Sequence, residues 1–265
     1  MPSMPGVGTH PDLPTTFVHF TGRPRSSGDA PPDFANGTPE ERMVRILIEG
    51  QLRATKVFGA SHPVLCFTEP SEIARRVMLR DGVTQRGPYA PWGLIFDRAR
   101  LIAAEATPVL HMSAQEMRLT ADLPVRSRNR RIRYEPGRSD WLHEREWRIC
   151  FGPEDEPSLH LTPDLLVGVI VGEQGWMPPP VVTVIKDYTE NKIIEIPRAS
   201  GRPVRVRAQL RVQQTNFRYS AAADQLVRWW WNGEDIVEDG VFDVQTQMSP
   251  DGSSIVSSTK TRISY

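Results

Sequence analysis

Cysteine is scarce in this chain, with only Cys66 and Cys150 among 265 residues. Each lies in an apolar run, and most of the predicted core separates them along the sequence. Disulfide-stabilised domains carry many closely spaced cysteines, whereas isolated thiols in apolar runs are typical of core residues in a reducing compartment. The sequence therefore predicts two free core thiols and no disulfide framework.

Long apolar runs are also absent. No stretch approaches the roughly 20 apolar residues that a membrane-spanning helix requires. Residues 1–14 are rich in proline and glycine and lack the basic region and apolar core of a secretory signal. We therefore expect a loose N-terminal arm at residues 1–14 and a cytoplasmic location.

Charge of neither sign is in excess, because 32 Lys and Arg residues balance 32 Asp and Glu residues. A neutral chain has no overall attraction to nucleic acid or to an anionic membrane, so any such contact must come from a local patch. The apolar fraction of 39% and the charged fraction of 24% are typical of ordinary globular proteins. A chain of this length can bury one sizeable core, or one domain and a small module.

Several standard functional motifs are missing. Residues 168–172 carry two glycines but lack the helix-opening GxGxxG pattern of dinucleotide-binding folds, and neither a GxxxxGK[ST] phosphate loop nor a GxSxG elbow occurs. The six histidines are scattered, and no Cys/His cluster has the spacing of metal ligands. These absences argue against nucleotide-binding P-loop proteins, α/β-hydrolases and metalloenzymes, and we expect no bound metal.

The patterning that is present predicts an α+β fold. One helix is well delimited, since Thr38 is a good N-cap, Pro39 suits the first helical position, and Gly50 suits the helix end. A second helix is expected over residues 71–80. Apolar and β-branched runs predict strands at residues 15–20, 63–69, 92–96, 106–112, 146–151 and 165–172.

The character of the sequence changes near residue 178, where we place a domain boundary. Strict alternation predicts a strand over residues 204–212, and residues 181–188 and 192–196 are expected to form a hairpin. A short helix is expected over residues 221–231. The predicted organisation is one enzyme-like domain at residues 15–178 and a β-rich C-terminal module at residues 179–265.

Three separated segments carry side chains that suit chemistry. Residues 19–22 end the first strand, residues 86–93 lead into a later strand, and residues 141–148 enter another. Since residues two apart on a strand share a face, Glu144 and Glu146 are expected to point into one cleft.

The order and spacing of these segments resemble the ADP-ribosyltransferase superfamily. The strand-borne His19-Phe20-Thr21, followed by a helix containing residues 45–52, is similar to the opening of that superfamily. Residues 64–69, 89–96 and 140–148 resemble further segments. The likeness extends over about residues 15–175 and is greatest to the bacterial toxin and phage-defence branch, namely DarT-type nucleic-acid modifiers and AbiGi-like abortive-infection proteins.

The resemblance implies a pair of small antiparallel sheets with flanking helices that hold NAD between them. His19 would hydrogen-bond the adenosine ribose, Tyr89 or Trp92 would stack on the nicotinamide ring, and Arg86 would bind the pyrophosphate. We therefore expect the NAD-binding residues to be His19, Thr21, Gly22, Arg86, Tyr89 and Trp92.

The resemblance also implies the chemistry. Glu146 would hold the nicotinamide ribose and stabilise the positive charge that develops when the glycosidic bond breaks. Glu144 would orient or deprotonate the acceptor, which the sequence does not specify as base, phosphate or protein side chain. The expected activity is NAD-dependent ADP-ribosylation by a toxin or anti-phage effector, with nicotinamide release.

Other interpretations stay open. His19 is also explained as a structural histidine, Tyr89 as packing in a turn, and Glu144 and Glu146 as an ion-paired strand face. A non-catalytic binding module would use a basic segment to grip nucleic acid and the adjacent tryptophans 229–231 to contact a protein partner or antitoxin. A metal-dependent nuclease would use Glu69 with Glu144 and Glu146, but it lacks a companion lysine. The basic segment comprises Arg126, Arg128, Arg130, Arg131 and Arg133.

Overall fold

The computed structural model describes residues 13–23, 37–57, 59–69, 71–82, 87–137, 142–178, 190–196, 204–210, 223 and 225–242. Arg86, residues 1–12 of the expected N-terminal arm (residues 1–14) and the expected strand at residues 181–188 lie outside the described residues.

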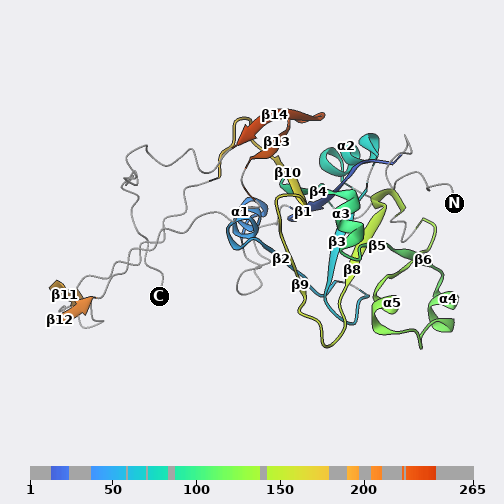
Figure 1. The fold of residues 1–265 in the computed structure, drawn as a ribbon, viewed down its shortest axis with the longest axis horizontal. Coiled ribbons are helices and arrows are strands. Elements are labelled where there is room, and N and C mark those ends of the chain that lie inside the picture. The colour runs from blue at the N-terminus through green and yellow to red at the C-terminus, as the bar shows by residue number, and fades with distance from the viewer. Residues whose placement is uncertain are drawn as a thin grey trace, which may run out of the picture.

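The described part of the chain is built on one eight-stranded sheet with the strand order β14-β13-β10-β4-β1-β3-β8-β5 (Figure 1). All neighbours in it are antiparallel except β10 and β13, which are parallel. Helices flank this sheet, so the expected α+β class is confirmed. The strands are β1 (Thr16–Phe20), β3 (Val64–Thr68), β4 (Gly93–Asp97), β5 (Thr107–Pro108), β8 (Glu146–Cys150), β10 (Leu166–Val171), β13 (Leu226–Trp231) and β14 (Ile236–Phe242).

Three two-stranded sheets complete the described strands. They pair β2 (Gln51–Arg53) with β9 (Ser158–His160), β6 (Leu110–Met112) with β7 (Arg131–Arg133), and β11 (Glu190–Ile196) with β12 (Val204–Leu210). The strand predicted from alternation over residues 204–212 is thus confirmed, and its partner is β11.

The predicted helix start and end are confirmed in α1 (Pro39–Glu49). Thr38 and Glu41 form a reciprocal capping box, and Gly50 adopts a left-handed conformation with φ of 62° that closes the helix. The second predicted helix is α2 (Glu72–Arg80), capped by Ser71. The remaining helices are α3 (Arg98–Ala103), α4 (Ala114–Leu119), α5 (Val125–Asn129) and the 3₁₀ turn η2 (Leu142–Glu144).

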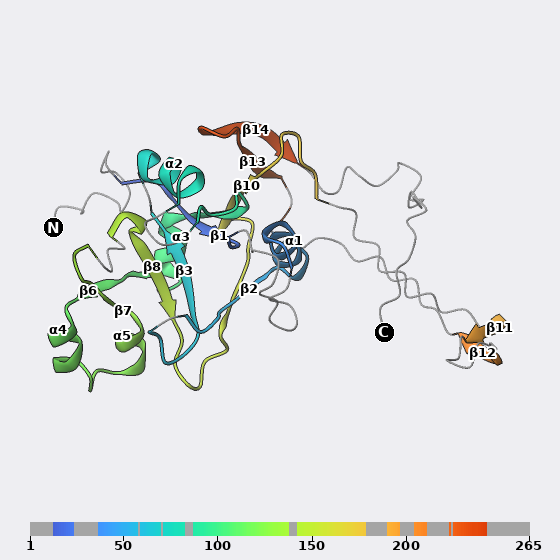
Figure 2. The same cartoon turned by 180° about the vertical axis from the view of Figure 1, so that it is seen from behind.

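The sheet has two packed faces. On the face covered by α1, which we call the α1 face, Phe17 and Phe67 pack with Met43 and Leu47 of the helix. On the opposite face, the α2 face, Val18 and other strand residues pack with Leu79 of α2. Figure 2 shows β13 and β14 at one end of the sheet and α4 and α5 beside the other end. Successive strand residues alternate between the two faces, so the position of a site residue along its strand determines the face on which its side chain lies.

The sheet is weakly joined in the middle. Strands β1 and β3 pair at one register position only, Val18 opposite Thr68, whereas β1–β4 and β3–β8 pair along their lengths. The resemblance implied two separate sheets, and the described strands instead form one sheet whose halves meet at this β1–β3 junction. A buried ion pair connects the ends of β3 and β4, the two strands that flank β1. Arg98, directly after β4, places its Nε 2.8 Å from Oε1 of Glu69, directly after β3.

The C-terminal residues correct two expectations. Residues 226–231 form a strand, not the expected helix, because the segment pairs in parallel with β10. In this strand alternate side chains pack on opposite faces of the sheet. Trp229 and Trp231 pack on the α2 face, and Trp230 packs on the α1 face. Strands β13 and β14 therefore complete the sheet of the first domain, and the expected boundary at residue 178 does not separate residues 225–242 from it.

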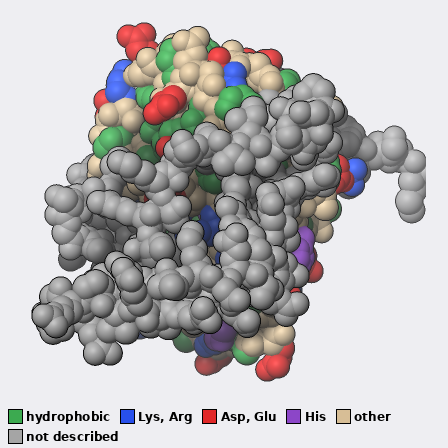
Figure 3. Space-filling model, turned by 90° about the vertical axis from the view of Figure 1, so that its left-hand side faces the viewer, with side chains coloured by type: hydrophobic (Ala, Val, Ile, Leu, Met, Phe, Trp, Pro, Cys, Tyr) green, Lys and Arg blue, Asp and Glu red, His purple; other side chains and the backbone are tan. Residues whose placement is uncertain are grey.

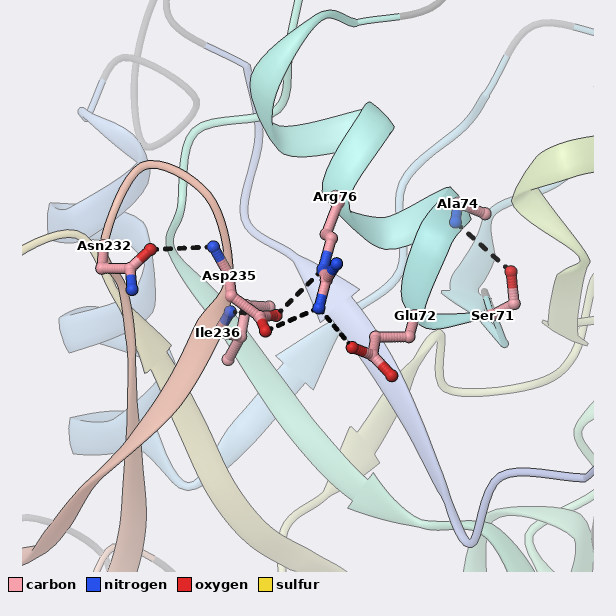
Figure 4. Close-up of polar contacts among 7 residues, drawn as sticks. All are labelled: Ser71, Glu72, Ala74, Arg76, Asn232, Asp235 and Ile236. Atoms are coloured by element: carbon pink, nitrogen blue, oxygen red, sulfur yellow. Dashed lines mark hydrogen bonds and ion pairs between the residues drawn. The ribbon is translucent and has the colours of Figure 1, made fainter.

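Ion pairs attach the β13–β14 hairpin to α2 (Figure 4). The Arg76 guanidinium donates to both carboxylate oxygens of Asp235, at 3.3 and 2.7 Å, and also pairs with Glu72 one helical turn away. The Asp235 carboxylate additionally accepts from the backbone N–H of Ile236 at 2.8 Å. A bidentate contact of this kind fixes orientation as well as distance, so the hairpin has a defined position on the α2 side.

Candidate functional site

Four side chains form an aromatic and charged group on the α2 side, which we call the Tyr89 cluster: Phe20, Arg23, Tyr89 and Glu144. The Tyr89 hydroxyl donates to Glu144 Oε1 at 3.2 Å. The Arg23 guanidinium carbon lies 3.7 Å from the centroid of the Tyr89 ring, and its Nη2 is 3.5 Å from the same Glu144 oxygen. The Phe20 ring stacks on Tyr89 with centroids 5.0 Å apart.

Backbone contacts after β1 position this cluster. The Thr21 hydroxyl donates to the carbonyls of Pro39 at 2.6 Å and Trp92 at 3.0 Å, and Ala90 N–H donates to the Gly22 carbonyl at 3.1 Å. Gly22 has φ of 145°, and a Cβ there would lie 2.7 Å from the Arg42 guanidinium. Residues 21 and 22 thus turn the chain so that the next residue reaches Tyr89.

Trp92, the alternative stacking residue, lies elsewhere. Its ring packs edge-on against Trp176 with centroids 5.4 Å apart, on the α1 face. Of the two expected stacking residues, Tyr89 is the one that the described residues place against Glu144.

Glu144 does not lie on a strand, which corrects one expectation. It ends the η2 turn, and the next residue, Arg145, has φ of 42°, so strand alternation does not relate Glu144 to Glu146. The turn is fixed where the Thr68 hydroxyl donates to the Glu144 carbonyl. The two carboxylates nevertheless interact: burial, and secondly the charge of Glu146, raise the pKa of Glu144.

Tyr89 responds to the same environment. Burial, and then the neighbouring Glu144 carboxylate, raise the pKa of the Tyr89 hydroxyl well above its usual value, although the Arg23 charge opposes this. The hydroxyl therefore stays a hydrogen-bond donor toward Glu144 over the whole physiological pH range.

Glu146, at the start of β8, is held by Arg148 two residues along the same strand face. Arg148 Nε lies 2.6 Å from Oε1 and Nη2 lies 3.3 Å from Oε2, while Nη1 donates to the Asn129 carbonyl at 2.8 Å. Cys66 faces this pair, and its thiol pKa is raised well above the usual value by burial and then by Glu146. Both cysteines are free and half-buried. Glu146 thus has the ion-paired environment that was one of the open interpretations, and it also lies close enough to Glu144 to act on it.

His19 lies on the other face of the sheet. Its ring contacts Phe67 at a centroid distance of 5.9 Å, and Nδ1 is 2.8 Å from the Cys66 carbonyl of the neighbouring strand β3. Burial lowers the pKa of His19, and the Arg42 charge lowers it further. Since Glu146 is opposite Thr68 and His19 is on the Phe67 side, the structure does not place His19 and Glu146 on one face.

The basic segment folds into a lobe with α4 and α5, and each of its five arginines has a partner within the chain. Helical C-termini attract cations, which explains the contacts to α4 carbonyls. These arginines build the lobe rather than form an unpaired basic patch. The contacts are Arg126 to Glu105 and Asp155, Arg128 to the Ala121 carbonyl, Arg130 to the Pro108 carbonyl, Arg131 to the Met117 and Thr120 carbonyls, and Arg133 to Glu135.

On the molecular face drawn in Figure 3, the described residues show acidic, basic and apolar side chains side by side rather than a field of one sign. Within the described ranges, no group of three or more His, Cys, Asp and Glu side chains is arranged to hold a metal ion. No helix in the described part of the chain is long and apolar enough to cross a membrane.

Sequence reasoning missed three residues of the site. Arg23, Phe20 and Asn129 were given no role. For Arg23 alone the sequence offered a signal of a role in the site. It directly follows Gly22 at the end of the first predicted strand, and the strand fixes the position of such a residue. Nothing in the sequence indicated that Asn129 would support Arg148.

Comparisons of this chain with protein-family models, with curated proteins and with solved structures found no match. Inference of function therefore depends on the residues and their geometry.

Proposed function

We propose that the protein is an NAD-dependent ADP-ribosyltransferase that modifies a nucleic-acid or protein acceptor and releases nicotinamide. The observation that carries the proposal is the Tyr89 ring, which has a flat cation against one face and donates its hydroxyl to Glu144, a carboxyl group whose pKa is raised by burial and then by the charge of Glu146. The expected family resemblance supports the same activity from the sequence.

The arrangement suits cleavage of the bond between nicotinamide and ribose. The bonding electron pair leaves with the nicotinamide nitrogen, which becomes neutral, and positive charge develops on the ribose. A carboxylate held in advance stabilises that charge where it forms. Glu146 is held in this way, because Arg148 fixes both of its oxygens.

Glu144 suits the second half of the reaction. The acceptor forms a new bond to the ribose carbon and loses a proton, which needs a nearby base. A carboxyl group whose pKa is raised toward neutral pH is a better proton acceptor than an ordinary one, and burial raises the pKa of Glu144.

The β1–β3 junction supports a place for the remainder of NAD. Two halves of a sheet that share one register position separate more readily than fully paired strands, and His19 of β1 is hydrogen-bonded to the Cys66 carbonyl of β3. The role as a toxin or anti-phage effector comes from the resemblance alone, and induced expression in bacteria tests it by growth arrest that depends on Glu146.

The enzymatic test is nicotinamide release from NAD by the wild-type protein, Glu146→Gln and Glu144→Gln, with cell lysate, RNA and single-stranded DNA as candidate acceptors. Glu105→Gln is the matched control, since this glutamate is exposed and pairs with Arg126 of the α4–α5 lobe. We expect release to fall at least 100-fold in Glu146→Gln and to persist in the control.

Equal release in all four proteins would show that these carboxylates are not catalytic. No release from the wild type with any acceptor, together with no NAD binding by calorimetry, would refute the proposed function.

A further inference from the structure

The Tyr89 ring is covered on both faces by groups from one short segment of the chain. Phe20 stacks on it at 5.0 Å with 26° between the ring planes, and the Arg23 guanidinium lies 3.7 Å from its centroid. Two groups this close cannot share a face, so Phe20 covers one face and Arg23 the other. The Phe20 side belongs to the packed core of the α2 face, and only the Arg23 side can exchange its occupant.

Arg23 is held there by modest forces. Its Nη2 is 3.5 Å from Glu144, its Nη1 donates to the Gly87 carbonyl, and its side chain keeps 20% of its exposure. A partly exposed cation on an aromatic face and a single long ion pair are each weak interactions. The guanidinium can therefore leave without disrupting the sheet.

The position that Arg23 occupies has a definite chemistry. A ligand there must be flat, to lie against the phenol ring, and positively charged, to match both the ring face and the half-buried Glu144 carboxylate. A guanidinium group and a pyridinium ring both meet these requirements.

We propose that the exposed face of Tyr89 and the Glu144 carboxylate form a binding site for a planar organic cation. Arg23 occupies this site in the free protein, and Arg23 must leave before the ligand can bind. The inference rests on the proposed function for its natural ligand, the nicotinamide ring of NAD. It adds that the chain competes with its own substrate at this position.

The consequence is a lowered apparent affinity. A ligand that binds only when Arg23 has left is penalised by the fraction of molecules in which the face is free. If the face is free in about one molecule in ten, which a cation–aromatic contact of ordinary strength provides, removal of Arg23 tightens binding about tenfold.

The experiment titrates the full chain with 1-methylnicotinamide, a pyridinium cation, and separately with methylguanidinium, and follows binding by calorimetry and NMR. The proteins are wild type, Arg23→Gln, Arg23→Lys and the double variant Arg23→Gln/Tyr89→Leu. Arg53→Gln is the matched control, because Arg53 is an exposed arginine whose guanidinium pairs with Glu49 on the helix α1.

We expect Arg23→Gln to bind one of the two probes about tenfold more tightly than wild type, Arg23→Lys to give a smaller gain because its ammonium is not planar, and Arg53→Gln to match wild type. The double variant should lose the gain because the ring face is gone. A gain for 1-methylnicotinamide identifies a pyridinium ligand, and a gain for methylguanidinium alone identifies an arginine side chain of a partner.

Binding to Arg23→Gln that equals or falls below wild type for both probes, in a protein with an unchanged unfolding midpoint, would overturn the inference. If Arg23→Gln does not fold, the same comparison is made with Arg23→Lys. This binding assay contains no NAD and requires no turnover. If Arg23→Gln gains affinity for a probe but the enzymatic test detects no nicotinamide release, the proposed function is refuted and the binding site stands.

Discussion

The Arg98–Glu69 ion pair should be essential to the stability of the sheet, and Arg98→Met tests this. Both side chains are nearly fully buried, at 9% and 4% exposure, and Glu69 also accepts from the Trp147 indole N–H at 3.1 Å. The Arg98 guanidinium carbon also lies 5.5 Å from the centroid of the Phe17 ring and 5.4 Å from that of the Trp147 ring. The pair therefore joins residues that follow β3 and β4, on either side of the weakly paired β1–β3 junction.

The expected loss of stability in Arg98→Met depends on how far the remaining Glu69 carboxylate is compensated. Removing one partner of a buried ion pair costs about 3–5 kcal/mol because the remaining charge is uncompensated. The Trp147 hydrogen bond stays, and Arg145, 3.6 Å from Glu69 and 40% exposed, supplies partial compensation. We therefore expect the lower end, about 3 kcal/mol, which corresponds to a fall in Tm of about 6–12 °C for a chain of this size.

The assay is urea and thermal unfolding of wild type, Arg98→Met, Glu69→Gln/Arg98→Met and Arg100→Met. Arg100 is the control because its pair with Asp164, at 3.2 Å, is exposed and should contribute at most about 1 kcal/mol. The double variant should recover part of the loss, since no buried charge remains. A loss below about 1 kcal/mol in Arg98→Met, or a double variant no more stable than the single one, would refute the reasoning.

Three further predictions concern other parts of the fold. The folded-state pKa of His19 lies below its ordinary value of 6.5, so the unfolded chain binds more protons as pH falls below that value. The wild type should then lose more stability than His19→Gln between about pH 7.5 and about pH 5.5, measured as urea midpoints, and equal losses would contradict this. Gly168→Ala should cost about 1–3 kcal/mol because a Cβ there would lie 2.7 Å from the Val227 carbonyl; Gly87→Ala, whose Cβ would meet nothing within 4 Å, is the control. Thr38→Ala should cost about 1 kcal/mol in thermal unfolding because it removes the capping box with Glu41, and no change in Tm would contradict that role.

The elements that sequence reasoning predicted correctly are those determined by local signals. Thr38, Pro39 and Gly50 fix the ends of α1 through backbone hydrogen bonding within a few residues, and the apolar run that forms β10 is buried on both faces as expected of a central strand. Residues 226–231 carry a signal of the other kind. Three adjacent tryptophans show neither a helical nor a strand periodicity. Whether the segment forms a helix or a strand is therefore determined by its pairing with β10, which is distant in the sequence.

The candidate site divides in the same way. Glu144 lies beside Tyr89 and is influenced by the charge of Glu146, although a turn and not a strand brings Glu144 there. His19 could not be assigned to a face, because that depends on whether β1 pairs in register with β3. The basic segment was interpreted as a nucleic-acid contact because its partners within the chain, chiefly carbonyl groups, carry no sequence signature.

The parallel pairing of β10 with β13 has a consequence during synthesis on the ribosome. Strand β10 is an uncharged run of Leu, Val, Gly and Ile, and its edge stays unpaired until residues 226–231 have been made, because the long segment 172–225 separates the two strands. At a synthesis rate of about 5–20 residues per second, the edge of β10 stays unpaired on the nascent chain for several seconds. An uncharged apolar strand without proline is a ready template for intermolecular pairing. Cells that express a chain truncated near residue 178 should therefore accumulate it in inclusion bodies, and chaperones that bind apolar strands should associate with the full-length nascent chain within that interval.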